Sequence, residues 1–182
     1  MRTLIVICLA SALLGLANRA AAEPPKKKVL DLIKDLKDRD PKNRAFAADE
    51  LGAMAEVRLA DAKPAIPALV AALKDRDPAV RKAVITSLGK VEPDPKDVVP
   101  SYIDMVRRDK DASVRLVAVT ALGQIGPPAK AAIPALKEAQ KAIKDREKLR
   151  EKDKGKDKDK NQAMDTALAT EIATALQKIQ AK

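Results

Sequence analysis

Histidine is absent from this 182-residue chain, and cysteine and aromatic residues are almost absent. The only cysteine is Cys8, the only aromatic side chains are Phe46 and Tyr102, and there is no tryptophan. Without histidine the chain cannot build a Ser–His–Asp triad, a histidine-ligated zinc site or the commonest general base. One cysteine cannot form an intramolecular disulfide. The sequence therefore predicts a protein that is not an enzyme and that uses no cofactor and no metal.

The residues that are present favour an all-α fold. Hydrophobic residues make up 46% of the chain, and most are alanine, leucine, valine and isoleucine, which pack well in helices. The formal net charge is +10. This basic character makes an anionic partner a possibility to weigh.

Residues 1–22 have the form of a secretory signal peptide. Arg2 gives the basic start, Leu4–Ala17 is an apolar run, and small residues precede a cleavage position before Glu23. The run is shorter than the ~20 residues that span a bilayer. The prediction is a soluble exported protein, periplasmic or secreted, whose mature form lacks Cys8. Removing Arg2 and Arg19 lowers the net charge from +10 to +8.

An internal repeat organises the rest of the chain. The stretch LKDRDP occurs at Leu36–Pro41 and again at Leu73–Pro78, and RRDKDA is a looser copy at Arg107–Ala112. The segments that follow align as DPKNRAFAADELGAM, DPAVRKAVITSLGKV and DASVRLVAVTALGQI. Each has an aspartate, an arginine four residues later, and a Leu-Gly pair further on. The aspartates are Asp40, Asp77 and Asp111, and the arginines are Arg44, Arg81 and Arg115.

Each of these segments is preceded by another apolar stripe with helical spacing, such as Val29, Leu32, Ile33 and Leu36. Each repeat is therefore predicted to be two amphipathic helices joined by a tight turn. A fourth unit is split by an insertion. Its first helix resembles the AIPAL segment of the second repeat, and its second helix begins near Met164, with Asp165 aligned to Asp77.

The predicted boundaries follow from this reading. Residues 1–22 are the signal peptide, 23–143 hold repeats one to three and the first helix of repeat four, and 163–182 form its second helix. Between them, 144–162 is a charged low-complexity insertion. It is expected to extend the preceding helix for a few turns and to become a mobile loop after Gly155.

The acidic turn has a structural explanation. Asp40, Asp77 and Asp111 are placed to cap the second helix of each repeat, because an aspartate oxygen accepts the free N–H groups at a helix start. Arg44, Arg81 and Arg115 are predicted to pair with the aspartate of the same or the adjacent repeat. The rival reading is a calcium site built from Asp38, Asp40, Asp75 and Asp77. The sequence lacks the glycine and late glutamate of a calcium loop, so capping is preferred.

These motifs resemble the HEAT-repeat family, in particular the bacterial HEAT-like repeats of the phycobilisome-lyase type. The resemblance is carried by LKDRDPAVRKAVITSLGKV at Leu73–Val91, VRLVAVTALGQIGP at Val114–Pro127 and PAIPALV at Pro64–Val70. It implies a short α-solenoid of about four HEAT-like helical hairpins, with the second helices lining a concave surface. It implies binding of other macromolecules and no particular activity.

The resulting function prediction is a scaffold that holds a protein or peptide partner on the concave face. The candidate partner-binding residues on the second helices are Lys82, Ile85, Thr86, Leu116, Val119 and Thr120. Ile85, Leu116 and Val119 are apolar where a solvated helix would carry polar residues. They either line a groove or pack against the adjacent repeats, and the sequence leaves both readings open.

The alternative function is electrostatic binding of an acidic polymer or a membrane surface. Lys26, Lys27, Lys28 and the lysines of the insertion would carry it. Residues 141–160 contain six acidic residues besides ten basic ones. The opposite charges neutralise each other at short range, which weakens this reading. Nucleic acid is a poor candidate, because the chain lacks stacking aromatics and any base-reading motif.

Overall fold

The computed structural model describes residues 26–152 and 160–181, and every regular element in these two ranges is helical. The predicted signal peptide and the region around Gly155 lie outside the described residues. The first helices of the four hairpins are α2 (Lys26–Asp35), α5 (Ile66–Ala72), α7 (Pro95–Arg108) and α9 (Ile133–Lys152). The second helices are α3 (Pro41–Val57), α6 (Pro78–Val91), α8 (Ala112–Ile125) and α10 (Lys160–Gln180).

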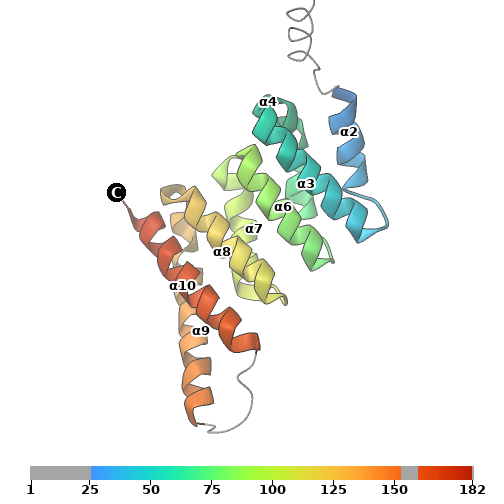
Figure 1. Ribbon diagram of the computed structural model, residues 1–182. Coiled ribbons are helices and arrows are strands. Elements are labelled where there is room, and N and C mark those ends of the chain that lie inside the picture. Colours follow the sequence, from blue (N-terminus) through green and yellow to red (C-terminus); the bar gives the residue numbers. More distant parts are fainter. Residues whose placement is uncertain (1–25, 153–159, 182) are drawn as a thin grey trace, which may run out of the picture.

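Two layers of helices result (Figure 1). The second helices α3, α6, α8 and α10 lie side by side in one layer, and each contacts the next. The first helices pack behind them, α5 on α6, α7 on α8 and α9 on α10. The all-α solenoid predicted from the repeat is confirmed.

Short helical segments replace simple loops between some hairpins. The connector after the first repeat contains α4 (Leu59–Ala62) and the 3₁₀ turn η2 (Lys63–Ala65). A second 3₁₀ turn, η3 (Pro127–Ala132), leads into α9. No helix in the described part of the chain combines the length and apolar character needed to cross a bilayer.

The core lies between the two layers and between successive repeats. The repeated leucines Leu51, Leu88 and Leu122 are fully buried in it. The glycine after each leucine allows close stacking at two junctions. An added Cβ would lie 2.8 Å from Ser87 Oγ at Gly52 and 3.1 Å from Ala175 Cα at Gly123. The Leu-Gly pair therefore sets how closely the second helices approach.

Candidate functional site

The aspartate of each repeated turn caps a second helix. The carboxylate of Asp40 accepts the Lys42 N–H at 2.9 Å, and that of Asp77 accepts the Ala79 N–H at 2.8 Å. Asp111 accepts the N–H groups of Ser113 and Val114 at 2.9 and 3.0 Å. Hydrogen bonds donated to its carboxylate by the Ser113 hydroxyl and by these amides lower the pKa of Asp111. Each cap stabilises its helix by about 1 kcal/mol.

The repeated arginines pair with a different aspartate from the one that caps. Arg44 donates through Nε and Nη2 to both carboxylate oxygens of Asp75 in the next repeat, at 2.7 and 2.8 Å. Its third group, Nη1, donates to the main-chain carbonyls of Asp38 and Arg39 at 2.9 and 3.1 Å. Both charged side chains are nearly inaccessible, with 6% and 11% of their surface exposed. The sequence analysis predicted that the arginine pairs with a capping aspartate. The partner is instead the aspartate two residues before the cap, Asp75 and not Asp77.

Arg81 repeats this arrangement one unit further along. Its Nε and Nη2 donate to Asp109 at 2.8 and 2.6 Å, and its Nη1 donates to the carbonyls of Asp75 and Arg76 at 2.8 and 3.2 Å. Asp75 and Asp109 also accept the N–H of the capping aspartate two residues later. The first aspartate of the turn thus joins two repeats, while the second starts a helix.

Arg115 is held in the same pose but lacks the carboxylate. Its Nη1 donates to the carbonyls of Asp109 and Lys110 at 2.8 and 3.4 Å. Among the side chains that the structure describes, its Nε and Nη2 meet no acceptor. The ladder therefore has two closed rungs, Arg44–Asp75 and Arg81–Asp109, and one that we term the open rung, at Arg115.

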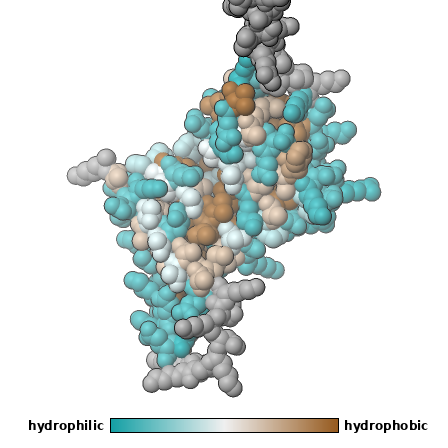
Figure 2. Space-filling view, in the orientation of Figure 1, coloured by the Kyte–Doolittle hydropathy of each residue, from teal (hydrophilic) through white to brown (hydrophobic). Residues whose placement is uncertain are grey.

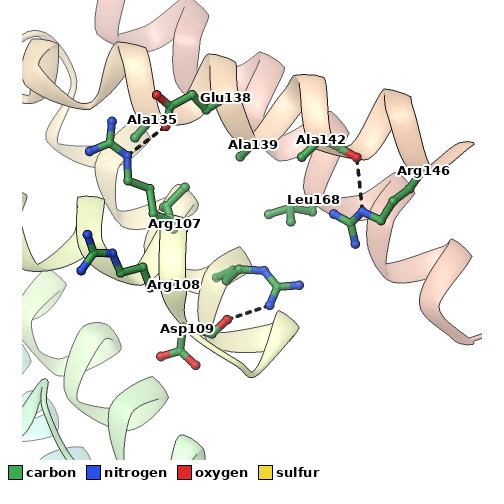
Figure 3. Close-up of a pocket in the computed structure, with 11 residues that line it drawn as sticks. Arg107, Arg108, Asp109, Ala135, Glu138, Ala139, Ala142, Arg146 and Leu168 are labelled. Carbon is green, nitrogen blue, oxygen red and sulfur yellow. Dashed lines mark hydrogen bonds and ion pairs between the residues drawn. The ribbon is translucent and has the colours of Figure 1, made fainter.

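A cavity of ≈ 550 Å³ lies at the open rung, between α7, α8, α9 and α10 (Figure 3). Its walls include four arginines and two carboxylates. Apolar and small side chains complete the lining, which is Val106, Arg107, Arg108, Asp109, Arg115, Ala135, Glu138, Ala139, Ala142, Arg146 and Leu168. Arg107 Nε lies 3.0 Å from the Glu138 carboxylate. Figure 3 shows this pair between α7 and α9.

The rung is open because α9 continues as a helix where earlier repeats turn. On α9, Ala142 and Arg146 line the cavity together with Asp109, whose carboxylate closes the preceding rung. The insertion that begins at Lys144 is helical as far as Lys152. The expected extension of the first helix is thus present. The fourth repeat has continuous helix where the earlier repeats have their acidic turn.

Asp165 is the acidic residue that joins α9 to α10 instead. It lies inside α10, so the residue that aligns with Asp77 in sequence does not start the second helix of the fourth repeat. Its carboxylate is 5% exposed and contacts Arg146 Nη1 at 3.0 Å and Arg150 Nη1 at 3.1 Å. Two arginines of the predicted insertion are therefore part of the fold.

The candidate partner-binding residues divide into two groups. Ile85 and Val119 are 1% and 0% exposed and belong to the core, so they cannot contact a partner. For these two, packing between repeats is the correct one of the two readings. Thr86 is exposed, and three residues are half-buried, namely Lys82, Leu116 and Thr120.

Phe46 is the surface residue that the sequence reasoning missed. It is the only phenylalanine, it lies on α3, and 62% of its surface is exposed. Its position, six residues after the capping aspartate, is occupied by Ala83 and Val117 in the next two repeats. A bulky residue where two copies have smaller apolar residues was the available signal. Figure 2 shows apolar surface near the middle of the same helix layer, flanked by hydrophilic residues.

The described residues show no group of three or more acidic, cysteine or histidine side chains that could hold a metal ion. The Asp38, Asp40, Asp75 and Asp77 set considered for calcium is engaged otherwise. Asp38 and Asp75 accept main-chain N–H groups, Asp40 and Asp77 cap helices, and Asp75 also binds Arg44.

Comparison with known proteins identifies the repeats. A model for HEAT repeats matches residues 29–100, and a model for the PBS lyase HEAT-like repeat matches residues 114–141. No curated protein matches. The crystal structure of an engineered protein is similar with a TM-score of 0.54 and 24% identity, over 83% of this chain. The match covers 62% of the engineered protein, and at this identity it shows the fold alone.

Proposed function

Because the chain belongs to the HEAT-repeat family, we propose that it is a non-catalytic binding protein that holds a protein or peptide on its second-helix face. HEAT repeats generally mediate protein–protein contacts or serve as scaffolds. The face consists of α3, α6, α8 and α10 and includes the candidates that remain at the surface, which are Lys82, Thr86, Leu116 and Thr120.

Exposed Phe46 is the observation that carries this proposal. An aromatic side chain with 62% of its surface in water is costly for a monomer and is enriched where proteins bind each other. Half-buried Leu116 and Val117 on α8 extend the apolar character along the same layer. A rigid row of stacked helices suits an extended or helical segment of a partner.

Leu30 provides a matched control for Phe46. It is 65% exposed but lies on α2, in the other layer. Tagged protein carrying Phe46→Ser or Leu30→Ser is cross-linked in extract of its source cells, and the recovered partners are compared with wild type by quantitative mass spectrometry. We expect Phe46→Ser to lose specific partners by about tenfold or more and Leu30→Ser to keep them. Equal recovery from both variants would refute the second-helix face.

The electrostatic alternative is distinguished by salt. Some of the basic residues that would bind an anion already form ion pairs within the chain. Lys28 contacts Glu50 at 3.7 Å, and Arg146 and Arg150 contact Asp165. Exposed Lys144 and Lys148 remain available. This alternative predicts recovery that falls steeply between 50 and 500 mM salt, roughly, and that Lys144→Gln with Lys148→Gln reduces. Salt-independent recovery favours the helix face.

Export is a further part of the proposal. It rests on the form of residues 1–22 in the sequence. Mass spectrometry of the mature protein from its source should find an N-terminus at Glu23 in the exported fraction. A protein that retains Met1 and stays with the cytoplasmic fraction would contradict export.

A further inference from the structure

We propose that the open rung at Arg115 is a binding site for a carboxylate group of a partner peptide, an aspartate or glutamate side chain. This site lies at the turn edge between the third and fourth repeats and is separate from the second-helix face. The two closed rungs show what the site accepts, because the chain itself fills the same geometry twice with an aspartate.

The first step of the argument is that Arg115 is already positioned. Its Nη1 is fixed by two main-chain carbonyls, at 2.8 and 3.4 Å, as in Arg44 and Arg81. As in the closed rungs, this contact uses Nη1, and it leaves Nε and Nη2 of a side chain that lines the cavity without an acceptor among the described residues. A guanidinium presents this edge to the two oxygens of a carboxylate in one plane. A ligand would therefore bind without the entropic cost of ordering this side chain.

The second step is the charge of the cavity. Its lining includes Arg107, Arg108, Arg115 and Arg146 and two carboxylates, Asp109 and Glu138. The other charged groups of the lining have partners, which are Arg107 with Glu138, Arg108 with Asp104, Arg146 with Asp165, and Asp109 with Arg81. Arg115 is thus the one charged group of the lining with no ion pair among the described residues, and its positive charge favours an added negative charge.

The third step is the size and walls of the cavity. A volume of ≈ 550 Å³ admits a side chain together with part of the backbone that carries it. Val106, Ala135, Ala139 and Leu168 give the cavity an apolar side, which suits the methylene groups of an acidic residue. Val106 is 3% exposed, so this wall is part of the packed core and is rigid.

The test uses NMR of the arginine Nε–H groups in the full mature chain. The probes are the capped pentapeptide acetyl-Ala-Ala-Asp-Ala-Ala-amide and its asparagine counterpart. We expect the Arg115 Nε resonance to shift and saturate with the aspartate peptide, and the asparagine peptide to bind at least about fivefold more weakly. Equal affinities would overturn the proposal.

Ala142→Glu tests the site without removing any contact. Ala142 is exposed and lines the cavity, so a glutamate there can supply the missing carboxylate from within the chain. Peptide binding should be lost in Ala142→Glu and kept in Ala142→Gln, which has the same shape without the charge. Binding that survives Ala142→Glu, or that is lost equally in Ala142→Gln, would overturn the proposal.

Two further measurements distinguish a specific carboxylate site from nonspecific electrostatic attraction. Arg115→Lys keeps the positive charge but loses the planar edge, and it should weaken the aspartate peptide by about fivefold or more. Unchanged affinity would mean that only the local potential attracts the peptide. Inorganic phosphate that shifted the Arg115 resonance at lower concentration than the peptide would assign the site to phosphate groups and overturn the carboxylate assignment.

Discussion

The closed rungs and the open rung contain the same arginine in the same pose, with different neighbours. Arg44 and Arg81 each bind a carboxylate from the next repeat, whereas Arg115 faces a cavity lined by Ala142 and Arg146. The difference arises because α9 continues through the place where earlier first helices end. One sequence position can therefore join repeats or present a binding group, according to what the next repeat provides.

The two regions also differ in how well their ion pairs are shielded from water. In the closed rungs the charged groups are shielded, with 6% and 11% exposure in one pair and 14% and 6% in the other. In the fourth repeat the ion pairs lie within the hairpin, where Asp165 of α10 contacts two arginines of α9 that are 45% and 37% exposed. Loss of a partner should cost more where the remaining charge is buried.

The largest effect is expected for Arg44→Ala. Without the arginine, the shielded carboxylate of Asp75 has no cationic partner, which typically costs about 3–5 kcal/mol. Arg115→Ala is the matched control and should cost only about 1–2 kcal/mol, because it removes hydrogen bonds to two carbonyls and strands no carboxylate among the described residues. Urea unfolding followed by circular dichroism gives both values. Equal costs would remove the distinction between the rungs.

Gly123→Val tests how closely α10 is seated on α8. The first added carbon would already lie 3.1 Å from Ala175 Cα and Cβ, so the helices must separate, at a cost of about 1–3 kcal/mol. Gly89 is the control, since its added carbon would meet only Gln124 Oε1, at 3.6 Å. Gly89→Ala should be neutral or stabilise by up to about 1 kcal/mol through helix propensity. Urea unfolding measures both variants. An unchanged stability in Gly123→Val would show that α10 does not pack closely on α8.

Asp165→Asn tests the ion pairs between α9 and α10 within the fourth repeat. Its two ion pairs would be weakened, but the arginines can reach water, so we expect a loss of only about 1–2 kcal/mol. Hydrogen exchange should accelerate in α9 and α10 more than in α3 and α6. A uniform change across all helices would mean that Asp165 does not act locally.

The pH dependence of unfolding stability tests the closed rung formed by Arg44 and Asp75. Burial alone would raise the pKa of Asp75, but hydrogen bonds from Arg44 and the Asp77 amide outweigh it and lower this pKa below its usual value. The rung's stabilisation is therefore complete above the unfolded pKa, about 4, and is lost as pH falls through the lower folded pKa. Wild type should lose more stability than Arg44→Ala between about pH 5 and 2. Parallel curves would contradict the rung's role.

The smallest effect is expected when the open rung is closed from within. Ala142→Glu should stabilise the chain by up to about 1 kcal/mol relative to Ala142→Gln, because the pair it forms with Arg115 is only partly shielded. Thermal unfolding of the two variants gives the difference. A less stable glutamate variant would show that the arginine edge is not directed into the cavity.

The sequence by itself determined the repeat, the helices and the caps. Asp40, Asp77 and Asp111 act on N–H groups two or three residues away, and the stripe containing Leu51, Leu88 and Leu122 follows from helical periodicity. Such short-range interactions depend only on neighbouring residues, which the repeat displays directly.

The tertiary structure alone decided which groups meet across repeats. Arg44 and Asp75 are 31 residues apart, and the choice of Asp75 over the capping Asp77 depends on how the hairpins stack. The burial of Ile85 and Val119, the place of Asp165 within α10 and the cavity at Arg115 depend on stacking in the same way. The helices α5 and α7 end before Asp75 and Asp109, so that each carboxylate reaches an arginine of the preceding repeat, whereas α9 continues to Lys152.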